Sequence, residues 1–206
     1  MALAVKKSMD QLGIPVTLKT AAVAVGLYIL GSYVWDVWIR PKKEALKAKN
    51  RAKQLKKPML NVGAGTPDSS LRAALLGPQL AGDVNVDISA PKGTPHGPDR
   101  VSHADVQDLP FKDKEFGVAY TSHLLEHVDD PQKALSELHR VADEVVNVTP
   151  RWWAPHTWLY PDHKWYVSGD QKTFIPLWSR SKAAQAARSR AQANGKLRPI
   201  RTARRA

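Results

Sequence analysis

A short loop rich in glycine is the first part of the sequence whose residue types could do chemistry. It covers residues 63–67, between an apolar strand expected at 59–62 and a helix expected at about 68–76. Glycines at such a turn let the backbone approach a ligand, and the helix behind it supplies free N–H groups and the positive end of its dipole. The loop therefore indicates a ligand site, with an ordinary tight turn as the alternative.

Acidic residues follow at the ends of the next two expected strands. Asp87 lies in the strand expected at 84–88, and Asp105 follows the strand expected at 101–104. An acid about 20 residues beyond a glycine loop, at the tip of the second strand, accepts hydrogen bonds from the two hydroxyls of a ribose. This spacing predicts a ribose-binding role for Asp87, and a solvated turn before Ser89 is the alternative.

A third group of polar residues follows the strand expected at 117–121. His123, Glu126 and His127 spell His-x-x-Glu-His, a pattern that binds zinc when both histidines lie on one long helix. Because this pattern directly follows a strand, we assign no metal ligand; in the alternative interpretation His127 packs in the turn and Glu126 is solvated. An imidazole titrates near neutral pH, so His123, His127 and His156 are candidate general bases, with His123 preferred for its place after the strand.

Residues 151–166 are unusually aromatic and contain four of the seven tryptophans. Such a segment either borders a pocket for a second substrate or covers the sheet in place of missing strands, and the composition favours neither. The candidates for pocket residues are Trp152, Trp153, His156, Trp158, Tyr160, His163 and Trp165.

The elements that must position these residues are predicted by apolar runs between turn signals. A helix is expected from residue 130 or 131 to 141 and a fifth strand at 144–148, whereas the prolines and glycines of 91–98 exclude a helix after the second strand. This order predicts an α/β fold, a Rossmann-like, doubly wound, mostly parallel sheet of about five strands that binds ligands at the carboxyl ends of its strands.

The N-terminal part reads as a transmembrane helix at 16–39 that precedes this sheet. Residues 20–35 carry no charge, Tyr33, Trp35 and Trp38 are typical of a membrane interface, and Asp36 can pair with Arg40 one turn on. Nine Lys or Arg and one acid in 40–57 predict a cytoplasmic location for the rest of the chain by the positive-inside rule. A buried or interfacial helix and a cleaved signal peptide are the alternatives.

Composition divides the remaining chain. The 206 residues carry a net charge of +12 and no cysteine, which excludes disulfides, thiolate zinc sites, Fe–S clusters and a cysteine nucleophile. We expect an N-terminal segment at 1–15, the transmembrane helix at 16–39, a basic juxtamembrane linker at 40–57, a folded domain at 58–178 and a basic tail at 179–206. The tail predicts RNA, protein or anionic lipid as a partner.

The motifs, taken in order, resemble the class I S-adenosylmethionine-dependent methyltransferases over about residues 57–170. They are LNVGAGT (60–66), NVDIS (85–89), ADVQDLPF (104–111), FGVAYTSHLLEHVDDPQKALSELHRV (116–141) and EVVNVTP (144–150). The resemblance implies S-adenosylmethionine as cofactor and a methyltransferase-like domain at 58–178. The cofactor-binding residues that it implies are Asn61, Gly63, Ala64, Gly65, Asp87, Asp105, Val106, Thr121 and Ser122.

The sequence departs from this family in the first strand and its loop, in the second crossover and after the fifth strand. Asn61 replaces an acid common in the first strand, Pro67 replaces a further glycine, and neither the second crossover helix nor the sixth and seventh strands have a clear counterpart. From the resemblance and the N-terminal helix together, we expect a membrane-anchored methyltransferase with a lipid-like or small-molecule acceptor. The alternative is a catalytically degenerate scaffold whose basic tail binds RNA, protein or anionic membrane.

Overall fold

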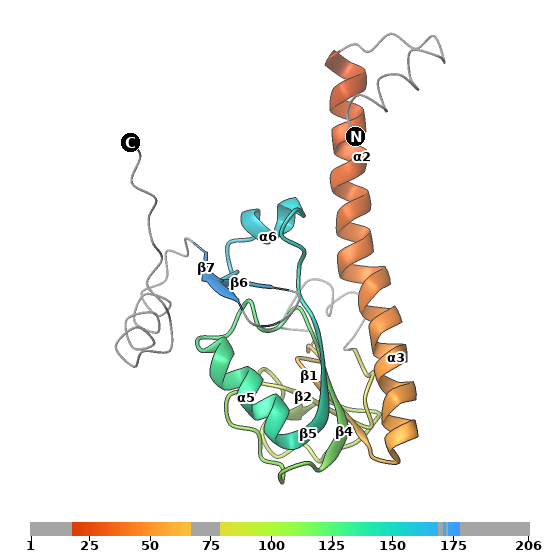
Figure 1. Ribbon diagram of the computed structural model, residues 1–206, viewed down its shortest axis with the longest axis vertical. Coiled ribbons are helices and arrows are strands. Elements are labelled where there is room, and N and C mark those ends of the chain that lie inside the picture. Colours follow the sequence, from red (N-terminus) through yellow and green to blue (C-terminus); the bar gives the residue numbers. More distant parts are fainter. Residues whose placement is uncertain (1–17, 67–78, 169–170, 172, 178–206) are drawn as a thin grey trace.

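The computed structural model describes residues 18–66, 79–168, 171 and 173–177, and its centre is one parallel sheet (Figure 1). The strands are β1 (Met59–Val62), β2 (Val84–Asp87), β3 (Ser102–His103), β4 (Phe116–Ser122) and β5 (Ala142–Val148). Their spatial order is β3-β2-β1-β4-β5, and every neighbouring pair is parallel. This topology confirms the predicted Rossmann-like α/β fold.

One face of the sheet is covered by α5 (Pro131–Val141). Asp130 precedes the helix, and its side chain accepts hydrogen bonds from the backbone N–H groups of Gln132 and Lys133 and so caps the first turn. Its apolar side, with Leu138 and Val141 fully buried, packs in the main core cluster of the domain.

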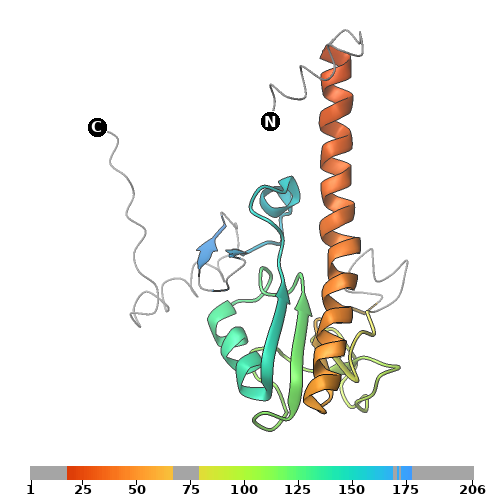
Figure 2. The same ribbon diagram turned by 45° about the vertical axis from the view of Figure 1, so that its right-hand side comes forward.

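The opposite face is covered by α3 (Arg40–Leu55), the segment expected as a basic linker (Figures 1 and 2). Ala48 and Ala52 are buried in a second cluster with Met59, Val118 and Tyr120. A Cβ atom on Gly117 of β4 would lie 3.5 Å from the Cα of Ala52, so small residues allow the helix and the sheet to come close together. The lysines of α3 lie on its other sides, and the helix belongs to the folded domain.

Helix α3 is the last part of a long N-terminal helix. α2 (Leu18–Val34) leads through a five-residue π-helix, η1 (Trp35–Ile39), directly into α3. The stretch Thr20–Leu55 is long and apolar enough to cross a membrane. Figure 2 shows α2 projecting away from the sheet as a rod, and its apolar side chains are largely exposed, Leu27 at 64%. The span expected at 16–39 therefore falls on α2 and η1, apart from residues 16 and 17, which lie outside the described residues.

The segment after the parallel sheet forms a second, small sheet that packs on the main core through Trp165 and Val167. It contains α6 (Pro155–Leu159) and two antiparallel strands, β6 (Trp165–Val167) and β7 (Phe174–Pro176), which pair with each other and not with the five-stranded sheet. Residues 88–101, all of which are described, contain no helix, as predicted. The helix expected at 68–76, the segment 1–15 and the tail at 179–206 lie outside the described residues.

Candidate active site

The glycine loop lies at the carboxyl end of β1 and is fixed to β2 by hydrogen bonds. Gly63 and Gly65 have φ angles of 79° and 77°, in the left-handed region that favours glycine. The N–H groups of Gly63 and Ala64 donate to the carbonyl oxygen of Val86, and the N–H of Gly65 donates to Oδ2 of Asp87 at 2.8 Å. These hydrogen bonds thus attach the loop to the strand that carries the predicted ribose-binding acid.

Asp87 lies at the end of β2 and uses both carboxylate oxygens. Oδ1 accepts from the N–H of Ser89 at 2.8 Å, while Oδ2 accepts from Gly65. Each oxygen keeps a second lone pair, which is what two vicinal hydroxyls would need. The carboxylate is therefore oriented by the backbone before any ligand binds.

Asn61, the polar residue of β1, lies under the glycine loop and not in it. Asn61 is buried, and its amide donates to Oδ1 of Asn85 at 3.0 Å and to the carbonyl oxygen of Gln79. Both amide hydrogens are thus engaged within the protein. Asn61 stabilises the strands under the loop, and this use of its amide was not evident from the sequence.

Asp105 and Val106, the residues implied to meet the adenine, follow β3. Oδ1 of Asp105 accepts from the N–H of Gln107 at 2.9 Å, and Val106 is buried in the main core cluster. They lie at the same edge of the sheet as the glycine loop and Asp87, because parallel strands end on one side.

The end of β4 supplies two buried hydroxyl groups. Oγ1 of Thr121 and Oγ of Ser122 have no hydrogen-bond partner within the described part of the chain. The next turn brings Leu124 close to the glycine loop, since a Cβ on Gly63 would lie 3.2 Å from its side chain. Unsatisfied hydroxyls beside a close-approach glycine fit a polar ligand bound at this edge, so the residues present fit S-adenosylmethionine.

His123 turns the chain sharply at the end of β4. Its φ angle is 53°, which is uncommon for a residue with a Cβ and typical of functional turns. Nε2 lies 3.0 Å from the carbonyl oxygen of Asp36, and Nδ1 lies 3.2 Å from Oε1 of Glu126. Burial alone would lower the pKa of His123, but the close contact with the negative charge of Glu126 outweighs burial and the pKa is raised. With an acceptor at each nitrogen, His123 fits an imidazolium ion.

Asp36 joins the long helix to this turn. It lies in η1, is fully buried and has Arg40, Arg151 and His156 within 3.4, 3.5 and 3.9 Å of its carboxylate. Arg40 also donates to the carbonyl oxygen of Thr149, at the end of β5, at 2.8 Å. The pairing with Arg40 agrees with the sequence prediction. The contacts with Arg151 and His156, more than a hundred residues away, had no local signal in the sequence.

His156 lies in α6, and its ring packs edge-on against Tyr33 at 5.6 Å between centroids. Burial lowers the pKa of His156, although the charge of Asp36 opposes this effect. Its imidazole is therefore neutral at neutral pH and retains a lone pair, unlike that of His123.

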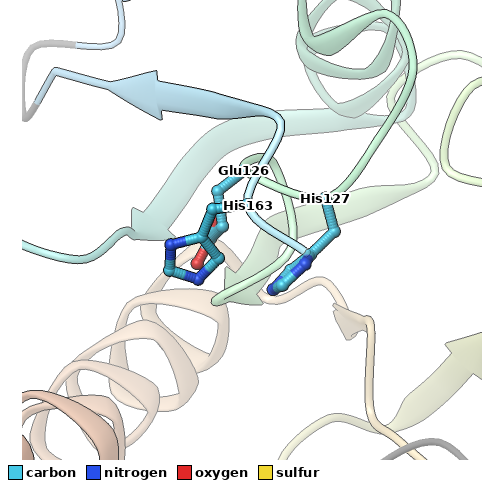
Figure 3. Close-up of side chains that lie close together, drawn as sticks. All are labelled: Glu126, His127 and His163. Atoms are coloured by element: carbon cyan, nitrogen blue, oxygen red, sulfur yellow. The ribbon is translucent and has the colours of Figure 1, made fainter. Parts of the chain in front are cut away.

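His127, the third candidate base, belongs to a separate group with Glu126 and His163 (Figure 3). Burial alone would raise the pKa of Glu126, but His123 and His127 reverse this and lower it, while burial lowers the pKa of His163. Residues 123–129 form no helix, so the helical zinc site that His-x-x-Glu-His would require is not formed.

The aromatic segment divides into a buried and an exposed part. Trp165 is in the core, and its Nε1 donates to the carbonyl oxygen of Val128 at 3.0 Å, which is the covering role. Trp152 and Trp158 are 65% and 53% exposed, and Nε1 of Trp158 donates to the carbonyl oxygen of Trp152. The covering role thus holds for Trp165, and the expected pocket for a second substrate stays a prediction.

A parallel sheet of order 3-2-1-4-5, with a glycine loop after its first strand and an acid after its second, defines a nucleotide-binding domain of the class I methyltransferase type. Residues 60–144 match a family described as "Methyltransferase domain", which supports the class I S-adenosylmethionine-dependent methyltransferase family for this part of the chain. S-adenosylmethionine is the cofactor of this class.

Solved structures with detectable similarity are distant. A SAM-dependent methyltransferase from Thermotoga maritima, described as a possible histamine N-methyltransferase, is 18% identical over 78% of this chain and 79% of its own, with a TM-score of 0.35. A complex of the Trm112 methyltransferase activator with a protein assigned as a methyltransferase, from Haloferax volcanii, is 18% identical over 54% of this chain and 55% of the other, with a TM-score of 0.25. Among curated proteins no significant match is found.

Proposed function

We propose that the protein is a membrane-anchored S-adenosylmethionine-dependent methyltransferase whose acceptor is lipid-like and enters from the membrane surface. The observation that carries this proposal is the continuity of one helix. The exposed apolar α2 leads without a break into η1. There Asp36 contacts the turn after β4 and Arg151, the first residue of the aromatic segment 151–166. The candidate anchor is therefore part of the candidate site.

In this proposal residues 16–39 span the bilayer and the basic side chains of 40–57 lie at its cytoplasmic surface. The domain at 58–178 is then on the cytoplasmic side, as the positive-inside rule predicts. α3 serves two purposes, because its alanines cover the sheet while its exposed lysines meet anionic headgroups.

The position of the aromatic residues beside α2 supports an acceptor that comes from the membrane. The ring of Trp153 lies 6.3 Å from that of Tyr28, well inside the proposed span. α6 therefore lies beside the membrane-facing helix, and Leu159 in it is 78% exposed. The aromatic group therefore lies beside the proposed span, and we infer that a lipid would approach His156 along α2.

The chemistry needs few side chains. Bound S-adenosylmethionine supplies a methyl group on a sulfonium, whose transfer depends mostly on alignment and exclusion of water. We assign Gly63, Ala64, Gly65 and Asp87 to the binding of the methionine and ribose parts, and Thr121 and Ser122 to the same pocket. Asp105 and Val106 take the adenine.

A hydroxyl or acidic carbon acceptor must lose a proton when it is methylated. Because His123 has an acceptor at both nitrogens, we assign the proton to His156 instead, with Asp36 as its positioning residue. His127 has its Nδ1 at the carbonyl oxygen of Asp162 and takes no part in this step.

Calorimetric titration of the full chain in lipid nanodiscs with S-adenosylmethionine tests the cofactor site. Asp87→Asn keeps the size of the side chain and should weaken binding at least about tenfold, the value of one charge-assisted hydrogen bond. Asp99→Asn, an exposed acid paired only with its neighbour Arg100, is the matched control and should bind normally. A folded chain that binds no cofactor would contradict the enzyme and favour the scaffold alternative.

The acceptor is tested by incubating the same nanodiscs, containing a total lipid extract, with methyl-labelled S-adenosylmethionine. Label that enters the organic phase, and is lost in His156→Gln but not in His139→Gln, supports a lipid acceptor. Label recovered only in the aqueous phase would refute that acceptor and leave a small molecule.

A further inference from the structure

We propose that Glu126, His127 and His163 form a binding site for a divalent transition-metal ion. One nitrogen from each imidazole and one carboxylate oxygen lie within 4.8 Å of one another. The residues come from two segments, the turn after β4 and the loop between α6 and β6, and Figure 3 shows the three side chains gathered between them.

Both imidazoles are oriented by backbone groups in the way that metal-binding histidines usually are. Nδ1 of His127 lies 3.1 Å from the carbonyl oxygen of Asp162, and Nδ1 of His163 lies 2.9 Å from that of Thr157. A carbonyl oxygen can only accept, so each Nδ1 must carry the hydrogen. When a ring binds a metal in this tautomer, its Nε2 supplies the lone pair that the metal needs.

The third ligand is a carboxylate with unused hydrogen-bonding capacity. Glu126 is buried, and neither of its oxygens has a hydrogen bond of good geometry within the described residues. His123 lies 3.2 Å from Oε1 and balances its charge, but the carboxylate retains further lone pairs. A cation between Glu126 and the two imidazoles would satisfy them.

The two segments are already held together without a metal. The N–H groups of Lys164 and Trp165 both donate to the carbonyl oxygen of Glu126, at 2.7 and 3.1 Å. The site is thus largely formed in advance, and the half-exposed His127 gives an ion a way in while Glu126 and His163 are buried. A bound ion would connect the turn that carries His123 to the segment that carries α6.

The donor set indicates the kind of ion. Two imidazole nitrogens and one carboxylate oxygen favour zinc and similar divalent transition metals over Mg²⁺ or Ca²⁺, which prefer oxygen ligands. Three protein ligands leave one position of a tetrahedral ion for water. This set differs from the His-x-x-Glu-His pattern, because His123 is absent from it and His163 is added.

Titration of the full chain, in detergent and with any affinity tag removed, with Zn²⁺ against a coloured chelator tests the site. We expect one equivalent of Zn²⁺ to bind, and Co²⁺ in its place to give the intense visible absorption of a tetrahedral nitrogen and oxygen site. His163→Gln and His127→Gln should each weaken Zn²⁺ binding more than about a hundredfold. His139→Gln, on the exposed side of α5, should bind like the wild type.

Thermal unfolding with and without Zn²⁺ separates a loss of Zn²⁺ binding from a general loss of stability in a variant. Zn²⁺ should raise the midpoint of the wild type and of His139→Gln but not that of His163→Gln. Equal binding by all variants, or no tight equivalent in the wild type, would refute the site. Neither measurement uses S-adenosylmethionine or an acceptor, so failure here is separate from failure of the proposed methyl transfer.

Discussion

The two halves of the N-terminal helix use small and apolar side chains in opposite ways. α2 is rich in Val, Leu and Ile and leaves them exposed, whereas α3 is rich in Lys and Arg and buries alanines against the sheet. The half with the more apolar composition is thus the one that makes fewer contacts with the domain. The composition of a helix indicates whether its exposed surface meets water or lipid. Whether its small residues are buried depends on the surface that packs against the helix.

Between these halves, η1 changes the side of the helix that meets the domain. A π-turn adds a residue to the helical turn and is often found at functional sites, and here it directs Asp36 inward. The junction, and neither half alone, thus connects the candidate anchor to the candidate site. The following variants test this difference between the two halves of the helix.

The largest effect is expected in the exposed half. Leu27→Lys should make membrane insertion less favourable by about 3 kcal/mol, because a charge is placed near the middle of the proposed span. The fraction of the chain that stays in the membrane after alkaline carbonate extraction measures it, with Leu27→Ala as the control. If both variants and the wild type are equally extracted, α2 is not an anchor.

At the junction, Asp36→Ala should lower the free energy of unfolding by about 2–3 kcal/mol. This is below the value for a fully buried pair, because Arg40 and Arg151 partly reach solvent. Denaturant unfolding in detergent measures the loss. Asp36→Asn, which keeps an acceptor oxygen, should lose less, and an unchanged stability of Asp36→Ala would refute the role of the junction.

In the buried half, Ala52→Leu should cost about 1–3 kcal/mol of unfolding free energy. Ala52 is 2% exposed and faces Gly117, so extra methyl groups would force the helix away from β4. Val25→Leu adds a methylene group to the exposed half and should leave the unfolding midpoint unchanged. Equal shifts for the two variants would mean that α3 does not pack on the sheet.

The smallest effect is expected on the charged side of α3. Arg51 pairs with Glu144 of β5 at 2.5 Å, but both side chains are nearly half exposed. Arg51→Ala should therefore lower the unfolding free energy less than Ala52→Leu does, because water and salt screen an exposed pair. A loss above that of Ala52→Leu, measured in the same denaturant series, would show that charges rather than the alanines hold the helix to the domain.

Much of the sheet could be predicted because its strands are short apolar runs between strong turn signals. The limits 59–62 were predicted for β1 and are those observed, and α5 begins at the predicted Pro131. Parallel strands have to end on one side of the sheet, so Asp87 and the glycine loop could also be placed together in advance.

The rest depended on contacts between distant residues. The alanines of α3 are a weak periodic signal among many lysines, so the sequence predicts a juxtamembrane linker and not a helix packed on the sheet. Nothing near Asp36 in the sequence indicates His156, and the local spacing of His123 with His127 obscured the approach of His163 to Glu126. Such pairings are fixed by how the segments pack, which local patterns do not encode.

The order of the elements along the chain also has a consequence for synthesis on the ribosome. α3 is made before the strands that it covers, since β4 begins roughly 60 residues after α3 ends. At about 5–20 residues per second, its alanine face waits about 3–12 s for a partner. During that interval the preceding apolar helix is already available to the membrane, so we expect the chain to be tethered before its sheet can close.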